Sequence, residues 1–196
     1  MRKDLITLKP LQSSFLSVEQ DTETLIRTLF IDTKPYSDIL KSLLVVNEPD
    51  CLDIKKYKQV LDSYSVKNLI DNNYIRLNPR VEEMAHEDLK TTILISFDEF
   101  TPNQTNELFL NNAIYFDIIC PYDSWNLDNF KIRPVQICGY IDGIFNLFNQ
   151  YKRGLSGAGK YMLVACQELI LNEYVGGYTL KYMATHFSED KGNVGE

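Results

Sequence analysis

The sequence contains few of the residues and spacings that usually build catalytic or metal sites. Only two histidines, His86 and His186, occur in 196 residues, and no HExxH, HxxxH or CxxC pattern is present. Zinc is commonly held by such spacings, so a zinc site of that kind is excluded. No GxSxG motif occurs, and no serine has evident histidine and acid partners. We therefore expect a protein that is not an enzyme and that holds no metal and no cofactor.

Long apolar runs and an excess of basic charge are also missing. No apolar run of seven or more residues follows the basic pair Arg2-Lys3, and no stretch approaches the ~18 uninterrupted apolar residues of a membrane span. Lysine and arginine number 20 against 27 aspartates and glutamates, which leaves a net charge of −7. Bulk attraction to nucleic acid or to an anionic membrane is therefore excluded. We expect synthesis in a cytosol, without a secretory leader and without a membrane partner.

The four cysteines stand far apart in the chain, at Cys51, Cys120, Cys138 and Cys166. The last three lie in apolar runs, where a cysteine usually packs as a small hydrophobic side chain. We expect reduced thiols rather than disulfides, with these three buried in the core.

One motif, Gly154–Lys160, has the GxxxxGK spacing of a phosphate-binding loop. The next residue is Tyr161, whereas the motif needs a serine or threonine hydroxyl for Mg²⁺. The segment also leads from a predicted helix into a predicted strand, so no helix amino-terminus would face the phosphate. We interpret the glycines as a helix stop and a connection, and we predict that no nucleotide binds here.

Carboxylates are numerous, but no pattern in the sequence brings several of them together. A metal-dependent nuclease or hydrolase needs two or three that converge on one point. Asp117 lies on the strand face opposite the predicted core, and Asp142 lies on the helix side away from Ile141 and Ile144, so we expect both to face solvent. The acidic residues considered are Asp98, Glu99, Asp117, Asp123, Asp128, Asp142, Glu168 and Glu173.

Residues 1–73 are predicted to form a helical part that packs on the remainder of the chain. Apolar residues recur there at helical spacing, with Asp21 or Thr22 as a first cap and Pro35 in the first turn of a second helix. The expected helices span about 22–30, 36–46, 54–64 and 66–70.

From residue 74 onward the apolar residues alternate as they do in strands. In residues 113–120, for example, Ile114, Phe116, Ile118 and Cys120 point to one face. Pro134 opens a helix with an apolar stripe. The predicted fold of residues 74–187 is α+β: a mainly antiparallel four-stranded sheet in the order β-hairpin, helix, β-hairpin, followed by a polar tail at 188–196. The expected strands are 89–97, 113–120, 160–171 and 178–187, with a further short one at 74–77.

Two predicted loops, 98–112 and 121–133, contain large apolar side chains where polar ones are usual. Their Pro, Asn and Asp residues are typical of exposed loops. Apolar residues in such loops either fold back on the core or contact partners, and we expect contacts with partners. The candidate interface residues are Phe100, Leu108, Phe109, Tyr122, Trp125 and Phe130.

The order of these segments resembles that of the tail-terminator and neck-ring proteins of tailed bacteriophages. The resemblance covers roughly residues 88–187 and rests on SFDEFTPNQTN, IYFDIICPYDSWNL, RPVQICGYIDGIFNLFN, LSGAGKYM and GGYTLKYM. It implies a non-enzymatic virion protein that forms a homo-oligomeric ring, six- or twelve-fold, in the head-to-tail connector. The implied partners are neighbouring copies, portal, neck or tail proteins, and genomic DNA that passes through the lumen without sequence-specific binding. The amino-terminal helices would be an addition to this common core.

Two other functions remain open from the sequence. One is a cytosolic α+β enzyme of the metal-dependent nuclease type, whose carboxylates converge only in the folded chain. The other is an assembly chaperone that acts in the host cytoplasm and does not stay in the virion.

Overall fold

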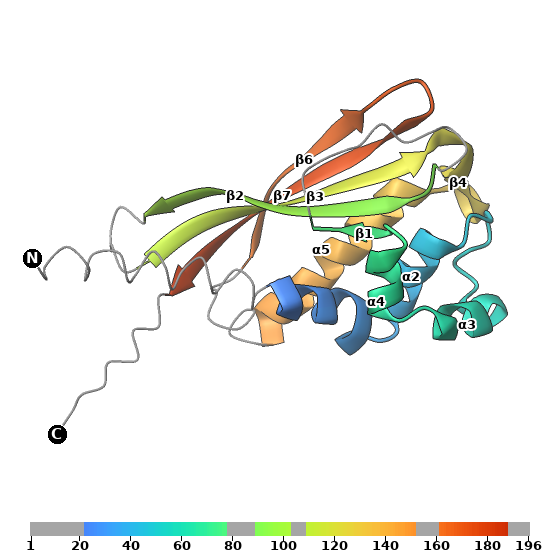
Figure 1. Cartoon of the computed structure of the whole chain (residues 1–196), viewed down its shortest axis with the longest axis horizontal. Coiled ribbons are helices and arrows are strands. Elements are labelled where there is room, and N and C mark those ends of the chain that lie inside the picture. The colour runs from blue at the N-terminus through green and yellow to red at the C-terminus, as the bar shows by residue number, and fades with distance from the viewer. Residues whose placement is uncertain (1–21, 78–88, 103–108, 152–160, 188–196) are drawn as a thin grey trace, which may run out of the picture.

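The computed structural model describes residues 22–77, 89–102, 109–151 and 161–187. A layer of helices lies against one face of a sheet, as the prediction of an α+β fold requires (Figure 1). The apolar side chains between these two layers form one core that includes Leu29 and Leu43 from the helices and Ile114 and Phe116 from the sheet.

The helical part follows the predicted pattern closely. Residues 22–27 are α-helical and continue into a π-helical turn, η1, at Thr28–Asp32. Asp53 and Ser65 cap the last two helices, because their side chains accept hydrogen bonds from the main-chain N–H groups of Lys56 and Asn68. The remaining helices of this part are α2 (Tyr36–Val45), α3 (Ile54–Ser63) and α4 (Val66–Asp71).

The main sheet has five strands in the order β1-β2-β3-β7-β6. Four of them are antiparallel, as predicted, and the short β1 adds a parallel pairing to β2. The strands are β1 (Ile75–Arg76), β2 (Thr92–Pro102), β3 (Phe109–Pro121), β6 (Met162–Ile170) and β7 (Val175–Phe187).

The strands β2 and β3 run farther than the sequence suggests, so the predicted loop 98–112 is wrong in its extent. Pairing continues through Pro102↔Leu110 after a bulge between Asp98 and Thr101. On its other side β3 pairs with β7 along its whole length, which keeps the polar residues of β3 extended. As a result Phe100 and Phe109 are strand residues, while Leu108 lies outside the described residues.

The helix α5 (Arg133–Tyr151) crosses the sheet on the side of the other helices (Figure 1). Its predicted stripe is confirmed at Ile137, Ile141, Ile144 and Phe145, all of which are buried. The alternation predicted for β3 is also confirmed, since Ile114, Phe116, Ile118 and Cys120 belong to the same core.

The strand β6 forms an edge of the sheet and is largely exposed on both faces. Cys166 is therefore exposed, which contradicts the expectation of a buried thiol. Cys120 is buried as expected, and Cys138 is half-buried. The apolar run around Cys166 is typical of a core strand, but the position of a strand within a sheet is decided by its pairing partners and not by its own composition.

Candidate interaction site

The segment between β3 and α5, residues 122–132, is a compact structure and not the open loop predicted for residues 121–133. We call it the linking segment. It contains two turns of 3₁₀-helix, η3 (Tyr122–Ser124) and η4 (Asp128–Phe130), and a small hairpin of β4 (Asn126–Leu127) with β5 (Lys131–Ile132).

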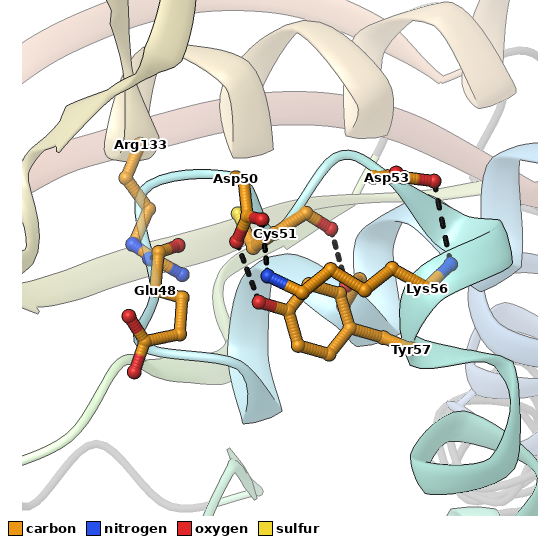
Figure 2. Close-up of polar contacts among 8 residues, drawn as sticks. Glu48, Asp50, Cys51, Asp53, Lys56, Tyr57 and Arg133 are labelled. Carbon is orange, nitrogen blue, oxygen red and sulfur yellow. Dashed lines mark hydrogen bonds and ion pairs between the residues drawn. The ribbon is translucent and has the colours of Figure 1, made fainter.

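Arg133, at the start of α5, attaches the linking segment to the amino-terminal helices. Its side chain is fully buried, and Figure 2 shows it reaching from α5 toward the loop that carries Glu48. The Nε atom donates to the carbonyl oxygen of Ser124 at 2.7 Å. The two Nη atoms donate to the carbonyls of Leu43 and Val46 at 2.7 Å, Asn47 at 3.0 Å and Glu48 at 3.2 Å.

Four of these five bonds use main-chain carbonyls at and just beyond the carboxyl end of α2. A cation is favoured at that end, because the unpaired carbonyls there carry partial negative charge. The main chain adds two further links: Asp128 N–H donates to the Pro49 carbonyl at 3.0 Å, and Arg133 N–H donates to the Trp125 carbonyl at 2.8 Å. The linking segment and the loop after α2 are therefore held as one rigid unit.

A second polar cluster holds the other side of that loop (Figure 2). Asp50 accepts hydrogen bonds from the ammonium of Lys56 and from the hydroxyl of Tyr57, the latter at 2.5 Å. The Lys56 bond is the main cause that lowers the pKa of Asp50, while Asp50 in turn raises the pKa of Lys56 and of Tyr57. Each shift moves the group further from titration near neutral pH, so this cluster stabilises the loop and is not poised to transfer protons.

Two of the candidate interface residues in the linking segment are turned toward their own subunit. The indole N–H of Trp125 donates to the Cys120 carbonyl at 3.1 Å, and the ring packs against the main core. The ring of Tyr122 lies edge-on to that of Trp125, with 4.9 Å between the ring centroids. These aromatic rings support the linking segment from inside.

Phe130 has the opposite placement. Its exposed fraction is 105%, so the ring touches almost nothing in its own subunit. Asn129 and Phe130 both adopt left-handed backbone angles, with φ of 59° and 61°. Asparagine tolerates this region, whereas for phenylalanine it is uncommon and costs free energy. A strained backbone that presents a bare aromatic ring is typical of a contact site.

A shallow hollow of about 270 Å³ lies beside the linking segment. Leu89, Tyr122 and Tyr174 contribute apolar surface to it, and Asp123 and Glu173 contribute acidic groups. It lies where the end of β3 meets the turn between β6 and β7, since Tyr122 N–H donates to the Tyr174 carbonyl at 2.9 Å. The hollow and Phe130 thus both adjoin the linking segment.

The remaining sequence candidates do not gather into a reactive site within the described residues. Asp117 accepts a hydrogen bond from Thr179 at 2.6 Å, and Asp142 accepts one from the buried Tyr182 at 2.9 Å, so the expectation that both simply face solvent is wrong. In the part of the chain that the structure describes, no cluster of three or more His, Cys, Asp or Glu side chains could hold a metal. His86 and the motif at 154–160 lie outside that part.

His186 lies in β7 opposite Leu110, and Phe100 is half-buried in β2.

The sequence did not reveal Arg133, whose hydrogen bonds hold the linking segment in place. The only sign of Arg133 in the sequence is that a basic residue stands directly before the proline that begins a helix.

No helix in the described residues is long and apolar enough to cross a membrane.

Comparison with known proteins gives one finding. The family model YomW matches residues 37–184, a range that begins in α2 and ends in β7. The match therefore includes α2, α3 and α4, the helix α5 and nearly all of the sheet. No curated protein and no solved structure matches the chain.

Proposed function

The chain belongs to the YomW family, which carries the name of a phage-derived gene, and from this phage association we propose that it is a structural protein of the virion neck. In this proposal copies of the chain form a six- or twelve-fold ring in the head-to-tail connector. The ring would join the portal side to the tail and surround the DNA channel. The order of the segments, which resembles that of tail-terminator and neck-ring proteins, supports this role.

The observation that carries the proposal is Phe130 on the linking segment. Burying a phenylalanine side chain that is otherwise exposed contributes about 1.5–3 kcal/mol. Because Arg133 and the loop after α2 already hold the linking segment, little conformational freedom would be lost when Phe130 enters a neighbour. Preorganised aromatic anchors of this kind dominate the energetics of protein interfaces.

The strands support a second contact region. The ends of β2, β3 and β7 extend beyond the layer of helices (Figure 1). Phe100 and Phe109 lie in these extended parts. A sheet that projects past its covering helices offers surface to a neighbouring copy or to the next component of the neck. Leu108, the third candidate of this stretch in the sequence, lies outside the described residues.

The acidic character of the chain suits a channel for DNA. Asp123 and Asp128 are exposed on the linking segment, and the whole chain carries −7. Negative charge repels phosphate, so DNA would pass such a wall without sticking. Like charge on free subunits also opposes premature self-association, so ring closure would depend on a preformed portal or neck surface.

The proposal is tested by truncating Phe130. We expect Phe130→Ala to retain the melting temperature of the parent, because the ring touches little in its own subunit, and to lower the fraction of chain assembled on portal or neck complexes. Val60→Ala, at an exposed apolar residue of α3, is the matched control. Assembly is measured by sedimentation and negative-stain microscopy. Unchanged assembly of Phe130→Ala would remove this residue from the proposed ring contact.

A further inference from the structure

The edge strand β6 has an unpaired side. It pairs with β7 along one edge, and no other strand of the described residues lies along its second edge. That second edge presents a row of main-chain N–H and C=O groups, which favours pairing with another strand. Figure 1 shows β6 at the border of the sheet, away from α2, α3 and α4.

The side chains of β6 are unusually apolar for an exposed strand. Val164 is 56% exposed and Ile170 is 69% exposed, and Met162 and Leu163 are exposed as well. Glu168 is the only charged residue of this strand, and the strand contains no proline. Edge strands usually carry charges, prolines or bulges that prevent contact with other strands.

The opposite border of the sheet has such protection. There β1 is only two residues long, and beyond it β2 is interrupted by a bulge between Asp98 and Thr101. Glu99 within the bulge has a left-handed backbone, and Pro102 ends the strand. A contact that joined β6 of one copy to β2 of the next would meet this irregular edge. The regular half of β6, Ala165–Ile170, finds a more regular partner in the β6 of another copy.

We propose that β6 pairs antiparallel with β6 of a second copy, about a two-fold axis that passes beside Cys166. This contact goes beyond the proposed ring and is independent of Phe130. Cys166 is the midpoint of Met162–Ile170, so this register overlaps the full length of both strands. The register of β6 against β7 is regular from Ala165 to Ile170, so the centre of the proposed pairing, Ala165–Gln167 of both copies, is regular, and the irregularity between Leu163 and Ala165 of each copy lies opposite Glu168 of the other.

Charge favours the same register. With Cys166 opposite Cys166, the two Glu168 carboxylates are four residues apart along the strands, or about 13 Å at ~3.3 Å per residue. That separation exceeds the screening length of about 8 Å at physiological salt. A register centred on Gln167 would bring the carboxylates to about 7 Å, where they repel one another.

The two-fold arrangement also covers two of the exposed apolar residues of β6, Leu163 and Ile170, on the face that Glu168 shares. Cys166 pairs with Leu180 of β7, whose side chain lies in the core beneath α5. Opposite residues of antiparallel strands point to the same face, so Cys166 is on the α5 side. A two-fold axis normal to the sheet places both α5 helices on that face. Leu163, which pairs with Tyr182, and Ile170 would then lie in the valley between the two helices.

The first test uses Cys166 as a probe of the register. Mild oxidation of the purified chain with copper phenanthroline and dioxygen should give a disulfide-linked dimer whose cross-link joins Cys166 to Cys166. Cys138→Ser should retain this product, and Cys166→Ser should abolish it. If peptide mapping finds only a link within one chain, or links that exclude Cys166, the proposed pairing is wrong.

The second test measures association directly. We expect the parent chain to sediment as a dimer or a multiple of it at about 50–100 μM, and Cys166→Lys to halve the mass, because two ammonium groups would lie directly opposite each other. Val60→Lys adds the same charge on α3 and should leave the mass unchanged.

Equal melting temperatures for the two lysine variants would show that both fold. A parent chain that stays monomeric, or a dimer that survives Cys166→Lys, would overturn the inference. A dimer that survives Cys166→Lys but is lost when residues 1–21 are removed would likewise overturn it, because the contact would then depend on those residues and not on β6. If Cys166→Lys still assembles into a ring, the ring does not need the β6 contact. The ring proposal is then judged by Phe130→Ala alone.

Discussion

The guanidinium of Arg133 donates a 2.7 Å hydrogen bond to the main-chain carbonyl of Leu43, a residue 90 positions earlier in the chain. Through this bond the first residue of α5 is joined to the last turn of α2. The same side chain also binds the Ser124 carbonyl. One buried cation therefore fixes the linking segment, the amino-terminal helices and α5 relative to one another.

Loss of the Arg133 side chain should destabilise the protein strongly. Arg133→Met removes the donor from five carbonyls, three of them in buried hydrogen bonds, and we expect the free energy of unfolding to fall by about 3–5 kcal/mol. Arg27→Met, at an exposed ion pair with Asp32, should cost less than about 1 kcal/mol. Urea unfolding measures both values. Similar losses for the two variants would contradict the role assigned to Arg133.

The four thiols should differ sharply in reactivity. Cys166 is exposed and should be alkylated rapidly by iodoacetamide in the native state, before any other thiol. Cys51 and Cys120 are buried, and burial raises the pKa of both, so little thiolate is available for attack. Mass spectrometry after timed labelling gives the order. Labelling of Cys120 as fast as Cys166 would show that the core around β3 opens readily.

The buried Cys120 thiol also predicts a dependence of stability on pH. Burial raises its pKa to about 12 from an ordinary value near 9. Between these values the folded state keeps a proton that the unfolded state releases, so the stability present below pH 9 is lost progressively as the pH rises.

We expect the free energy of unfolding to fall as the pH rises from 9 toward 12, and to fall less in Cys120→Ala. The half-buried Cys138 acts in the same direction, which is why the difference between the parent and Cys120→Ala is the quantity to measure. Equal pH slopes in the two proteins would exclude the contribution of Cys120.

Two glycines should respond to alanine in opposite directions. A Cβ atom at Gly177 would lie 1.7 Å from the main-chain oxygen of Ile118, so β7 or β3 would have to move, at a cost of about 1–3 kcal/mol or more. At Gly139, on the exposed side of α5, a Cβ atom meets nothing within 4 Å. Gly139→Ala should therefore stabilise the protein by about 0.5–1 kcal/mol. Thermal unfolding of both variants tests the pair; stabilisation by Gly177→Ala would contradict the close strand contact.

The sequence predicted the parts of the fold that local periodicity determines. The stripe of α5 and the alternation of β3 are examples, because each buries a regular face against the other. The extension of β2 and β3 beyond residues 97 and 113 was not predictable in this way. It depends on pairing with β7, which lies far along the chain.

The candidate site shows the same division. The apolar loading of the linking segment is visible in the sequence, but its separation into Trp125 on the core and Phe130 in solvent is a consequence of tertiary packing. Arg133 could not be identified from the sequence, because four of the carbonyls that it binds come from the end of α2 and the loop beyond it, which no pattern connects with α5. The exposure of Cys166 likewise follows from the place of β6 at the edge of the sheet.

The central claim is that this chain forms a ring in the phage neck, and a reconstruction of purified particles from a phage that encodes it tests that claim most directly. The account predicts a closed ring of six or twelve copies around the DNA channel, with Phe130 buried against a neighbouring subunit or neck protein. Particles that lack the chain would contradict the proposed function. Particles that contain it with Phe130 open to solvent would contradict the proposed contact.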